Sequence, residues 1–523
     1  MLKKFAATVV GLAAGLSLSG IVAAAEISIA LGAEVTSLDP HFHNLSPNNN
    51  VAEHVFDKLV LQDEMQRLKP GLAVSWRAID ERTWEVKLRQ GVKFHDGSAF
   101  TADDVAATFE RVPWVPNSPS AFTTYTKPIG HPIVLDPYTI QFKTEAPYPM
   151  LPVDIANVYI VSRKQAKAPT EEFNSGKAMN GTGPFKFASW TRGDRITLVR
   201  NEAYWGDKPT WDKVTFRQIT NDPTRVAALL AGDVNAIEIV PTADMARLKA
   251  SKDISIFRVV SNRIIFFHMD TDRDKTPAIF DKQGRPLEKN PLKDLRVCKA
   301  ISKAMNRSAI VDRVMEGEAI AAGQLLPDGF YGTSPNLKPE GYDVEGARKL
   351  LSEAGYGTGF AMIIHCPNNR YVNDEKICQA AAQMLGRVGI DAKVEAMPSN
   401  VFFSRANKLE FSFMLVGWGS GTGEVSSPLR ALLATFDRDR GMGASNRGRY
   451  SNRKVDALLD QALAMVDDGK REKLLQQASE VAINDLGIIP LHYQVNSWAT
   501  RKGYTYVPRT DESTFAFEFK PGS

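Results

Sequence analysis

Hydrophobic and polar residues alternate along several short stretches of the chain, as they do in half-buried strands. From Trp84 to Leu88 and again from Tyr138 to Phe142, the apolar residues fall on one face of an extended segment. Other stretches repeat apolar residues at helical spacing, as in "KVDALLDQALAMV", where one stripe holds Val455, Leu458, Leu459 and Ala462. The pattern therefore predicts a mixture of strands and helices, of the α/β or α+β class.

Helix ends are marked by capping residues. Thr101 is the predicted N-cap of "TADDVAATFER", and Asp222 that of "NDPTRVAALLAG", which closes at Gly232. The same logic places a helix between Asp343 and Gly355. Neither internal repeats nor a long flexible linker is visible, so the pattern alone leaves domain boundaries open.

The first 25 residues have the composition of a secretory signal. Lys3 and Lys4 precede the uncharged apolar stretch 5–22, and three alanines, 23–25, supply a small-residue cleavage site. An uncleaved membrane anchor is the alternative, since roughly 20 uncharged residues can span a bilayer. Later stretches are too short and too polar to cross a membrane, so we expect a protein secreted to the periplasm.

Composition and charge exclude several classes of protein. With 523 residues, 43% hydrophobic and 24% charged, the chain is ordinary globular material with room for two or three domains. Without Lys3 and Lys4 the formal charge falls from +4 to about +2. Because no basic cluster stands out, we expect no nucleic-acid partner.

The three cysteines permit at most one internal disulfide. Cys298 lies on a helical pattern and is predicted to be a buried thiol. Cys366 and Cys378 flank a short loop and are the better pair for a disulfide in an oxidising compartment.

A glycine-rich stretch, "GWGSGTGEVSSP" (417–428), follows a strand-like apolar run and raises the question of a phosphate site. A P-loop needs Lys and then Ser or Thr after its glycines, whereas here Glu424 and Val425 follow, so the nucleotide interpretation fails. The H-E-x-x-H and G-x-S-x-G patterns of secreted hydrolases are missing too. His41 and His43 are candidate metal ligands, but without a third ligand nearby they are more typical of loop hydrogen bonding, and we expect no metal or cofactor.

Several motifs together resemble those of the family 5 extracellular solute-binding proteins, the peptide, nickel and opine receptors of ABC importers. The segment "LRQGVKFHDGSAFTADDVAATFER" (88–111) carries the strongest likeness. The others follow in the family's order: "SLDPHFHN" (37–44), "GTGPFKF" (181–187), "NEAYWGDKP" (201–209), "LRVCKAISKAMNRSAI" (295–310), "YDVEGARKLLSEAGY" (342–356) and "GRYSNRKVDALLDQA" (448–462).

The resemblance implies an α/β, bilobed periplasmic binding protein of the Venus-flytrap type, with an extra inserted subdomain. It implies a ligand buried where the lobes close, a closed form that docks on a membrane permease, and no reaction at the site. By analogy the parts are lobe I (26–57, 199–267 and 489–523), the inserted subdomain (58–198) and lobe II (268–488).

The resemblance also implies ligand contacts in lobe II. In the family's peptide receptors an Asp three residues after the Trp of this segment pairs with the α-amino group, but here that position is Gly421. Glu424 falls near a second acidic position of the segment, so it either binds the ligand cation or is a solvated turn residue. Trp418 is either an aromatic platform for the ligand or a residue packed in the core. The segment's remaining candidates, which include backbone amides for ligand oxygens, are Gly419, Ser420 and Thr422.

A second segment, "CPNNRYVNDEKICQ" (366–379), resembles the one that carries an Arg for the ligand carboxylate. Arg370 is the nearest cation, with an ordinary surface salt bridge as the alternative, and Asn369 and Tyr371 are its neighbours. From lobe I the resemblance brings further residues toward the cleft: His41, His43, Asn44, His492 and Gln494.

The resemblance thus implies a monomeric receptor that passes a peptide or peptide-like solute to ABC permease subunits. Because Gly421 replaces the amine-binding Asp, the alternatives are an opine-like conjugate, a sugar derivative, another small organic acid or a metal chelate such as nickel. Two other functions stay open: a secreted hydrolase for a similar solute, and a receptor-like sensor or chaperone without a transporter.

Overall fold

The computed structural model describes residues 25–119 and 122–522. The predicted signal sequence, residues 1–25, lies outside this part of the chain apart from Ala25. Among the described residues, helices long and apolar enough for a membrane span are not found.

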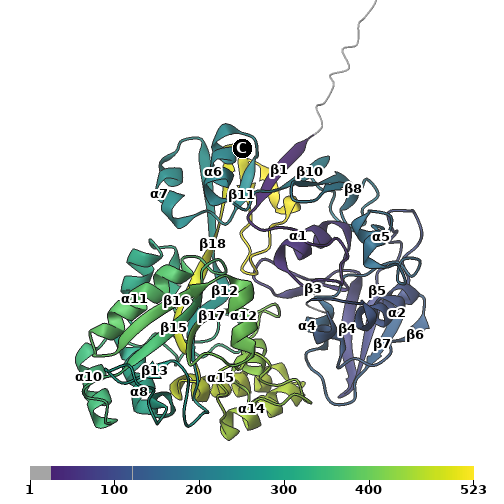
Figure 1. The fold of residues 1–523 in the computed structure, drawn as a ribbon. Helices are drawn as coiled ribbons and strands as arrows, with labels where there is room; N and C mark the ends of the chain where they lie inside the picture. The colour runs from purple at the N-terminus through teal and green to yellow at the C-terminus, as the bar shows by residue number, and fades with distance from the viewer. Residues whose placement is uncertain (1–24, 120–121, 523) are drawn as a thin grey trace, which may run out of the picture.

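A large mixed sheet runs through the molecule (Figure 1). Its strand order is β13-β15-β17-β12-β18-β11-β1-β10-β9-β8, with β14 beside β18 and β16 beside β15. The bounds are β1 Glu26–Leu31, β8 Phe185–Thr191, β9 Arg195–Arg200, β10 Lys213–Gln218, β11 Ala236–Glu238, β12 Ile254–Met269, β13 Ile279–Phe280, β14 Ala319–Ala321, β15 Ala361–Pro367, β16 Asp391–Met397, β17 Phe413–Gly419 and β18 Ile489–Arg501.

The long strands β12 and β18 connect the two halves of this sheet. Residues 254–260 of β12 pair with residues 495–501 of β18, and residues 264–267 pair with residues 489–493. Between these blocks the register shifts, and a bulge of this kind bends a strand and redirects its side chains. The crossing between the halves is therefore at residues 261–263 of β12.

A smaller antiparallel sheet, of order β4-β5-β7-β6, lies on the right of Figure 1, across from β15, β16 and β17. Two-stranded sheets, the hairpin β2-β3 and the pair β19-β20, complete the strands described. Their bounds are β2 Val60–Gln62, β3 Leu68–Pro70, β4 Ala73–Asp80, β5 Thr83–Leu88, β6 Ile133–Asp136, β7 Thr139–Lys143, β19 Tyr504–Tyr506 and β20 Phe519–Pro521.

Helices cover both halves. The α-helices are α1 Ser46–Val55, α2 Ala102–Arg111, α3 Thr123–Thr126, α4 Leu151–Ile155, α5 Thr170–Asn174, α6 Asp222–Ala231, α7 Thr242–Ala250, α8 Leu295–Ala304, α9 Arg307–Ala309, α10 Val344–Glu353, α11 Asp374–Gly386, α12 Ser399–Asn407, α13 Ser426–Pro428, α14 Arg453–Ala464 and α15 Asp468–Asn484. Short 3-10 and π segments are η1 Val112–Trp114, η2 Pro291–Lys293, η3 Ile310–Val314, η4 Leu429–Leu433 and η5 Ala516–Glu518.

The buried apolar side chains separate the halves. One cluster joins α1, the smaller sheet and β8 to β10, which are parts of the predicted lobe I and inserted subdomain. Two other clusters lie on opposite faces of β12 and β17 in the predicted lobe II, because alternate residues of a strand point to opposite faces. Ile265 and Leu415 pack on one face, and Ile264 and Val416 pack on the other. We keep the three predicted names for these parts; their boundaries stay predictions.

The capping predictions hold at two helices and need a correction at a third. Thr101 caps α2 in a capping box, and the Asp343 side chain accepts a hydrogen bond from the backbone of α10. At α6 the N-cap is Asn221, not Asp222, because the Asn221 side chain accepts from the Thr224 amide and Asp222 is already helical. The boundary was therefore one residue late.

Candidate functional site

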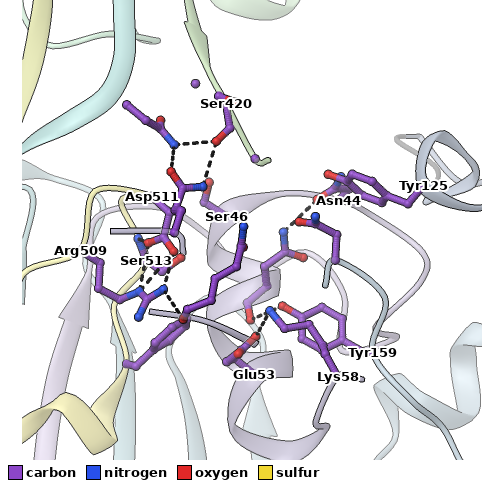
Figure 2. A pocket seen from close by; sticks show the side chains of 18 of the residues that line it. Asn44, Ser46, Glu53, Lys58, Tyr125, Tyr159, Ser420, Arg509, Asp511 and Ser513 are labelled. Atoms are coloured by element: carbon purple, nitrogen blue, oxygen red, sulfur yellow. Dashed lines mark hydrogen bonds and ion pairs between the residues drawn. The ribbon is translucent and has the colours of Figure 1, made fainter. Parts of the chain in front are cut away.

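A cavity of about 240 Å³ lies where the inserted subdomain, lobe I and lobe II meet (Figure 2). Segments far apart in the chain form its wall, and most of the lining side chains are polar. The lining residues are Asn44, Ser46, Asn49, Glu53, Lys58, Gln62, Gln66, Tyr125, Asn157, Tyr159, Asn262, Arg263, Gly419, Ser420, Gly421, Arg509, Asp511, Ser513 and Phe515.

Helix α1 presents a polar face to the cavity. Ser46, Asn49 and Glu53 are three and four residues apart, so they lie on one side of the helix, and all three line the cavity. Val51 and Val55 are buried in the core instead. The helix thus has one side for packing and one side for the site.

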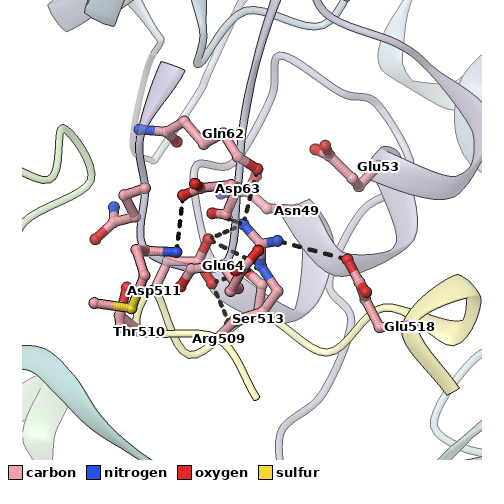
Figure 3. Close-up of polar contacts among 12 residues, drawn as sticks. Asn49, Glu53, Gln62, Asp63, Glu64, Arg509, Thr510, Asp511, Ser513 and Glu518 are labelled. Carbon is pink, nitrogen blue, oxygen red and sulfur yellow. Dashed lines mark hydrogen bonds and ion pairs between the residues drawn. The ribbon is translucent and has the colours of Figure 1, made fainter. Parts of the chain in front are cut away.

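Arg509 ties the C-terminal segment to the β2-β3 hairpin beside the cavity (Figure 3). Its guanidinium lies 2.7 Å from the Asp511 carboxylate and donates to the backbone carbonyls of Gln62 and Asp63. Burial by itself raises the pKa of Asp511, but the pairing with Arg509 lowers it below its ordinary value. Asp511 is therefore an ionised acid in the cavity wall.

Two further ion pairs contribute charge to the wall. Arg263, at the crossing between the halves, binds Glu512 through two N–H groups, with Nε–Oε1 and Nη2–Oε2 distances of 2.9 and 2.7 Å. Lys58 lies 2.7 Å from Glu53, and both side chains are largely buried. The cavity therefore offers both cations and anions within hydrogen-bonding reach of a small solute.

Direct contacts join the lobes beside the cavity. The Gln66 side chain donates to the Ser420 carbonyl at 3.0 Å, and the Asn262 amide donates to the Ser420 carbonyl at 2.6 Å. Gly423 has a φ of +67°, and a Cβ there would lie 2.8 Å from the Cβ of Gln66. Close approach at this glycine lets the lobes meet, so the structure is that of a closed cleft.

The structure brings four of the predicted residues to the cavity wall. Gly419, Ser420 and Gly421 line it from the end of β17, and Asn44 lines it from lobe I, where its amide donates to the Tyr125 hydroxyl at 3.1 Å. The glycine-rich segment is thus part of the site.

The two histidines of the first lobe are engaged elsewhere. His41 is fully buried, with Nε2 2.7 Å from the Tyr159 carbonyl and Nδ1 2.8 Å from the Arg111 guanidinium. Burial in the first place lowers the pKa of His41 to about 3. His43 is hydrogen-bonded to the Thr36 hydroxyl at 2.9 Å. Neither imidazole is among the residues that line the cavity: His41 is held by Tyr159 and Arg111, and His43 by the nearby Thr36.

His492 and Gln494 lie on β18 without lining the cavity. His492 is buried between β12 and β14, and desolvation lowers its pKa to about 3. The Gln494 amide is 3.4 Å from Glu512, so this residue supports the Arg263 pair from behind. Neither side chain is among the cavity residues.

Trp418 does not form a platform in the cavity. Side chains alternate along β17, so Trp418 points away from the face that Gly419 turns to Arg263, and its ring packs against the core that holds Val416. Core packing, the alternative for Trp418, is the arrangement found.

Glu424 and Thr422 also lie off the cavity. Glu424 is buried in an ion pair with Arg471 and accepts from the Ser426 hydroxyl. The Thr422 hydroxyl is 3.2 Å from that of Ser420. Glu424 is therefore neither a solvated turn residue nor a residue of the cavity wall.

Arg370 lies close to the charged pair of the cavity wall. Arg370 is exposed and does not itself line the cavity; desolvation by the surrounding protein lowers its pKa, and the neighbouring Arg263 charge lowers it further. The Tyr371 hydroxyl donates to the Gly417 carbonyl at 3.1 Å, and Asn369 accepts from the Ser399 amide at 2.8 Å. Tyr371 and Asn369 are thus structural neighbours of the cation.

The predicted Cys366–Cys378 disulfide is absent: both residues are free, buried thiols, as is Cys298. The two lie in the core between β15 and α11, and burial raises the pKa of Cys378 well above its usual range. The two thiols are neighbours in this core, and in the structure they are not bridged.

Thiol titration tests this arrangement. We expect three thiols per chain to react with a disulfide reagent after denaturation without reductant, and none to react within minutes in the native protein, because all three are buried. A count of one thiol in the denatured protein would contradict the structure.

The described residues contain no group of three or more His, Cys, Asp or Glu side chains placed to hold a metal ion.

Sequence reasoning missed the charged residues of the wall, above all Glu53, Lys58, Arg509 and Asp511. One local signal was available, namely the polar stripe at residues 46, 49 and 53 of a helix that is otherwise packed in the core. The ion pair of Arg509 and Asp511 offers no comparable signal, because the position of Arg509 depends on the β2-β3 hairpin, which is far away in the chain.

The fold and this polar cavity between two lobes are those of a solute-binding protein. Residues 67–439 match the family described as "Bacterial extracellular solute-binding proteins, family 5 Middle". The chain belongs to this family of bilobed periplasmic binding proteins, which confirms the predicted fold class.

Among curated relatives, the glutathione-binding protein GsiB of Escherichia coli (strain K12) is 28% identical, with 97% of this chain and 96% of the relative covered. Two solved structures share the fold. DppA from Helicobacter pylori, in complex with peptide STSA, has a TM-score of 0.77 at 24% identity and covers 95% of this chain and 98% of its own. HbpA2 from Haemophilus parasuis has a TM-score of 0.81 at 23% identity, covering 95% and 100%.

Proposed function

We propose that this solute-binding protein is a periplasmic receptor that captures a small peptide-like solute carrying both charges, and delivers it unchanged to an ABC import permease. The observation that carries the proposal is the cavity wall, where Glu53 and Asp511 lie with Lys58, Arg263 and Arg509. A zwitterion finds partners for both of its ends in such a wall.

The size and polarity of the cavity favour a compact, polar solute. Its volume of about 240 Å³ is below the roughly 300 Å³ at which pockets for drug-sized ligands begin. Phe515 is the one wholly apolar side chain among the lining residues. A wall of this kind selects by hydrogen bonding, since a wrong solute leaves buried polar groups unpaired.

For the amino group of the solute, acidic residues of lobe I take the place of the Asp that lobe II lacks at position 421. Gly421 lines the cavity without a side chain, whereas Glu53 and Asp511 bring carboxylates from α1 and the C-terminal segment. An ammonium group placed between them exchanges its hydration for charge-assisted hydrogen bonds. The relatives' names fit this class: glutathione for GsiB and the peptide STSA for DppA.

For the carboxylate of the solute, the candidate cation is Arg370, which lies near Arg263. Arg263 lines the cavity, and its charge acts on Arg370, which lacks a salt-bridge partner among the described residues. Glu512 neutralises the Arg263 guanidinium, so a second anion is favoured beside Arg370. A ligand carboxylate supplies that anion.

Solute binding and lobe closure are connected through the crossing segment of β12. Asn262 and Arg263 line the cavity at the point where the chain passes between the halves, and Asn262 also donates to Ser420 of lobe II. A solute that touches them in the closed form binds that form better than the open one, which is what closure requires. Micromolar affinity releases about 8 kcal/mol, enough for a strong bias.

Native mass spectrometry of protein purified without denaturation tests the proposal. We expect a co-purified zwitterionic solute of small mass, and calorimetry with reduced glutathione and with di- and tripeptides should then define the class. Recovery of the solute with unchanged mass after long incubation supports a receptor, whereas a product would favour the hydrolase alternative. Absence of binding to all of these compounds would contradict the peptide-like class.

Substitution of Arg370 tests the anionic end. We expect Arg370→Ala to weaken binding of the co-purified solute at least tenfold, because a charge-assisted hydrogen bond is worth about 1.5–3 kcal/mol. Arg285→Ala is the matched control, since that arginine is exposed in lobe II and pairs with Asp281 away from the cavity. Equal affinity of both variants in calorimetry would remove Arg370 from the site.

The remaining parts of the proposal concern the cell. Residues 1–25 act as a cleaved signal sequence, and the mature monomer reaches the periplasm, where its closed form docks on the permease subunits. Co-purification of the closed protein with membrane permease subunits tests the docking. A receptor without a transporter would show none.

A further inference from the structure

The glycine-rich segment continues from the cavity into a second contact between the lobes. Ser426, which follows the cavity residues 419–421 in the chain, is buried, and its hydroxyl is 3.6 Å from the Met150 thioether of the inserted subdomain. The Arg471 guanidinium of lobe II contacts the same thioether while it pairs with Glu424. Met150 is thereby enclosed by polar groups of the opposite lobe.

A polar pair of the inserted subdomain lies next to this thioether. The Tyr148 hydroxyl donates to the Asp154 carboxylate at the end of α4, and Asp154 is buried. Charges of lobe II act on it from across the interface: Glu424 raises the pKa of Asp154, and Arg430 and Arg471 lower it. We call Tyr148, Met150, Asp154, Glu424, Ser426, Arg430 and Arg471 the interlobe cluster.

The interlobe cluster is separate from the solute site. Its residues are not among those that line the cavity. Lobe II holds its own half in place without the partner lobe, since Arg471 pairs with Glu424, and the backbone of Glu424 bridges to that of Tyr331. Closure therefore brings a prepared surface of lobe II onto Tyr148, Met150 and Asp154.

We propose, building on the solute-receptor function above, that the interlobe cluster is a latch that stabilises the closed form whether or not a solute is present. The apparent affinity of a binding protein falls in proportion to the fraction of molecules in the competent form. A latch of this kind consequently sets the affinity for every solute by one common factor, whereas cavity residues distinguish one solute from another.

The energetics suit an adjustable latch. Closing removes water from the buried Glu424–Arg471 pair and from Asp154, a cost that can exceed the Coulomb gain of such pairs. The contacts of Met150 with Ser426 and Arg471, and the Arg430 guanidinium beside the Tyr148 hydroxyl, offset this cost. Because large opposing terms nearly cancel, loss of a single contact moves the balance between open and closed forms.

The latch is also expected to respond to pH. The groups that face Asp154 are Tyr148, Tyr125 on α3, Glu424, Arg430 and Arg471. Burial first, with Glu424 adding to it, raises the pKa of Asp154 to about 7 in the closed form. The latch requires that Asp154 is solvated, with an ordinary pKa, in the open form; closing then takes up a proton, so the closed form is favoured as pH falls toward 6 and loses this support as pH rises through 7.

Distance measurements on the solute-free protein test the latch. Spin labels are attached at Arg77→Cys on the inserted subdomain and Lys349→Cys on lobe II, since both side chains are exposed and the native cysteines are buried. We expect the wild-type background to populate the short, closed distance. Met150→Ala and Tyr148→Phe should lower the ratio of closed to open molecules at least fivefold.

Matched controls use the same subdomain. Leu135→Ala and Tyr138→Phe remove similar groups outside the cluster and are expected to leave the distances unchanged. Circular dichroism and melting curves confirm that each variant is folded. A wild-type protein that is wholly open without solute, or a closed fraction that Met150→Ala and Tyr148→Phe leave intact, would overturn the latch.

Two further measurements separate the latch from the solute site. Asp154→Asn should abolish the rise of the closed fraction between pH 8 and pH 6, and an unchanged rise contradicts the proton uptake. Met150→Ala and Tyr148→Phe should also weaken the binding of reduced glutathione. The loss of affinity should equal the factor by which each variant lowers the ratio of closed to open molecules in the distance measurements. If glutathione fails to bind even the wild-type protein, the proposed solute class is wrong, and the solute-free distances still decide the latch.

Discussion

Replacing Arg263 by methionine is expected to abolish solute binding, with a loss of affinity of at least a hundredfold, and to lower the free energy of unfolding by about 3 kcal/mol. Arg263 lines the cavity and holds Glu512 through two hydrogen bonds, while the two side chains are only 12% and 20% exposed. Its removal takes away the cation of the solute site and leaves a largely buried carboxylate unpaired. Calorimetry and denaturant titration measure the two losses separately.

The double variant Arg263→Met with Glu512→Gln separates these losses. The neutral amide no longer needs a cation, so most of the stability should return, while binding stays lost because the cation is still missing. A double variant that binds solute like the wild-type protein would show that Arg263 only supports the fold.

The pH dependence of stability gives a second check on this pair. Burial alone raises the pKa of Glu512, but Arg263 lowers it below the ordinary value. The pair's contribution to stability is therefore present above the ordinary glutamate pKa and lost as pH falls through the lowered one. The Arg263→Met variant should lack this acid-dependent contribution.

Local signals in the sequence were sufficient for much of the fold. Thr101 and Asp343 cap their helices as predicted, since a cap depends on only a few neighbouring residues. The alternation in residues 84–88 likewise places Trp84, Val86 and Leu88 in the core. The division into two lobes and an inserted subdomain rests on the family motifs, since no local pattern specifies it, and its boundaries stay predictions.

The site was predicted less well, for two physical reasons. Trp418 and Gly419 are neighbours in a strand, so they point to opposite faces, and naming both as cavity residues overlooked this period of two. Asp511 is held beside the β2-β3 hairpin by Arg509, which bonds to residues more than 440 positions earlier in the chain. Contacts of that range come from tertiary packing, which local sequence patterns do not report.

The Gly181→Ala substitution is expected to lower the free energy of unfolding by at least about 3 kcal/mol, a larger loss than most single substitutions cause. In "GTGPFKF" the backbone of Gly181 lies against the C-terminal end of α1, and a Cβ there would be 1.9 Å from the Val55 carbonyl oxygen. Backbone must move to relieve that contact, because no flexible side chain can yield. The Gly183 amide, which donates to the same carbonyl, would be displaced too.

Gly386→Ala provides the matched control. Gly386 is the last residue of α11, and a Cβ there meets nothing within 4 Å, so alanine should leave stability unchanged or raise it by up to about 1 kcal/mol. Because α1 carries Asn49 and Glu53 into the cavity wall, a shift of its C-terminal end in Gly181→Ala should also weaken solute binding. Denaturation of Gly181→Ala at the wild-type midpoint would show that the motif is not packed as the structure has it.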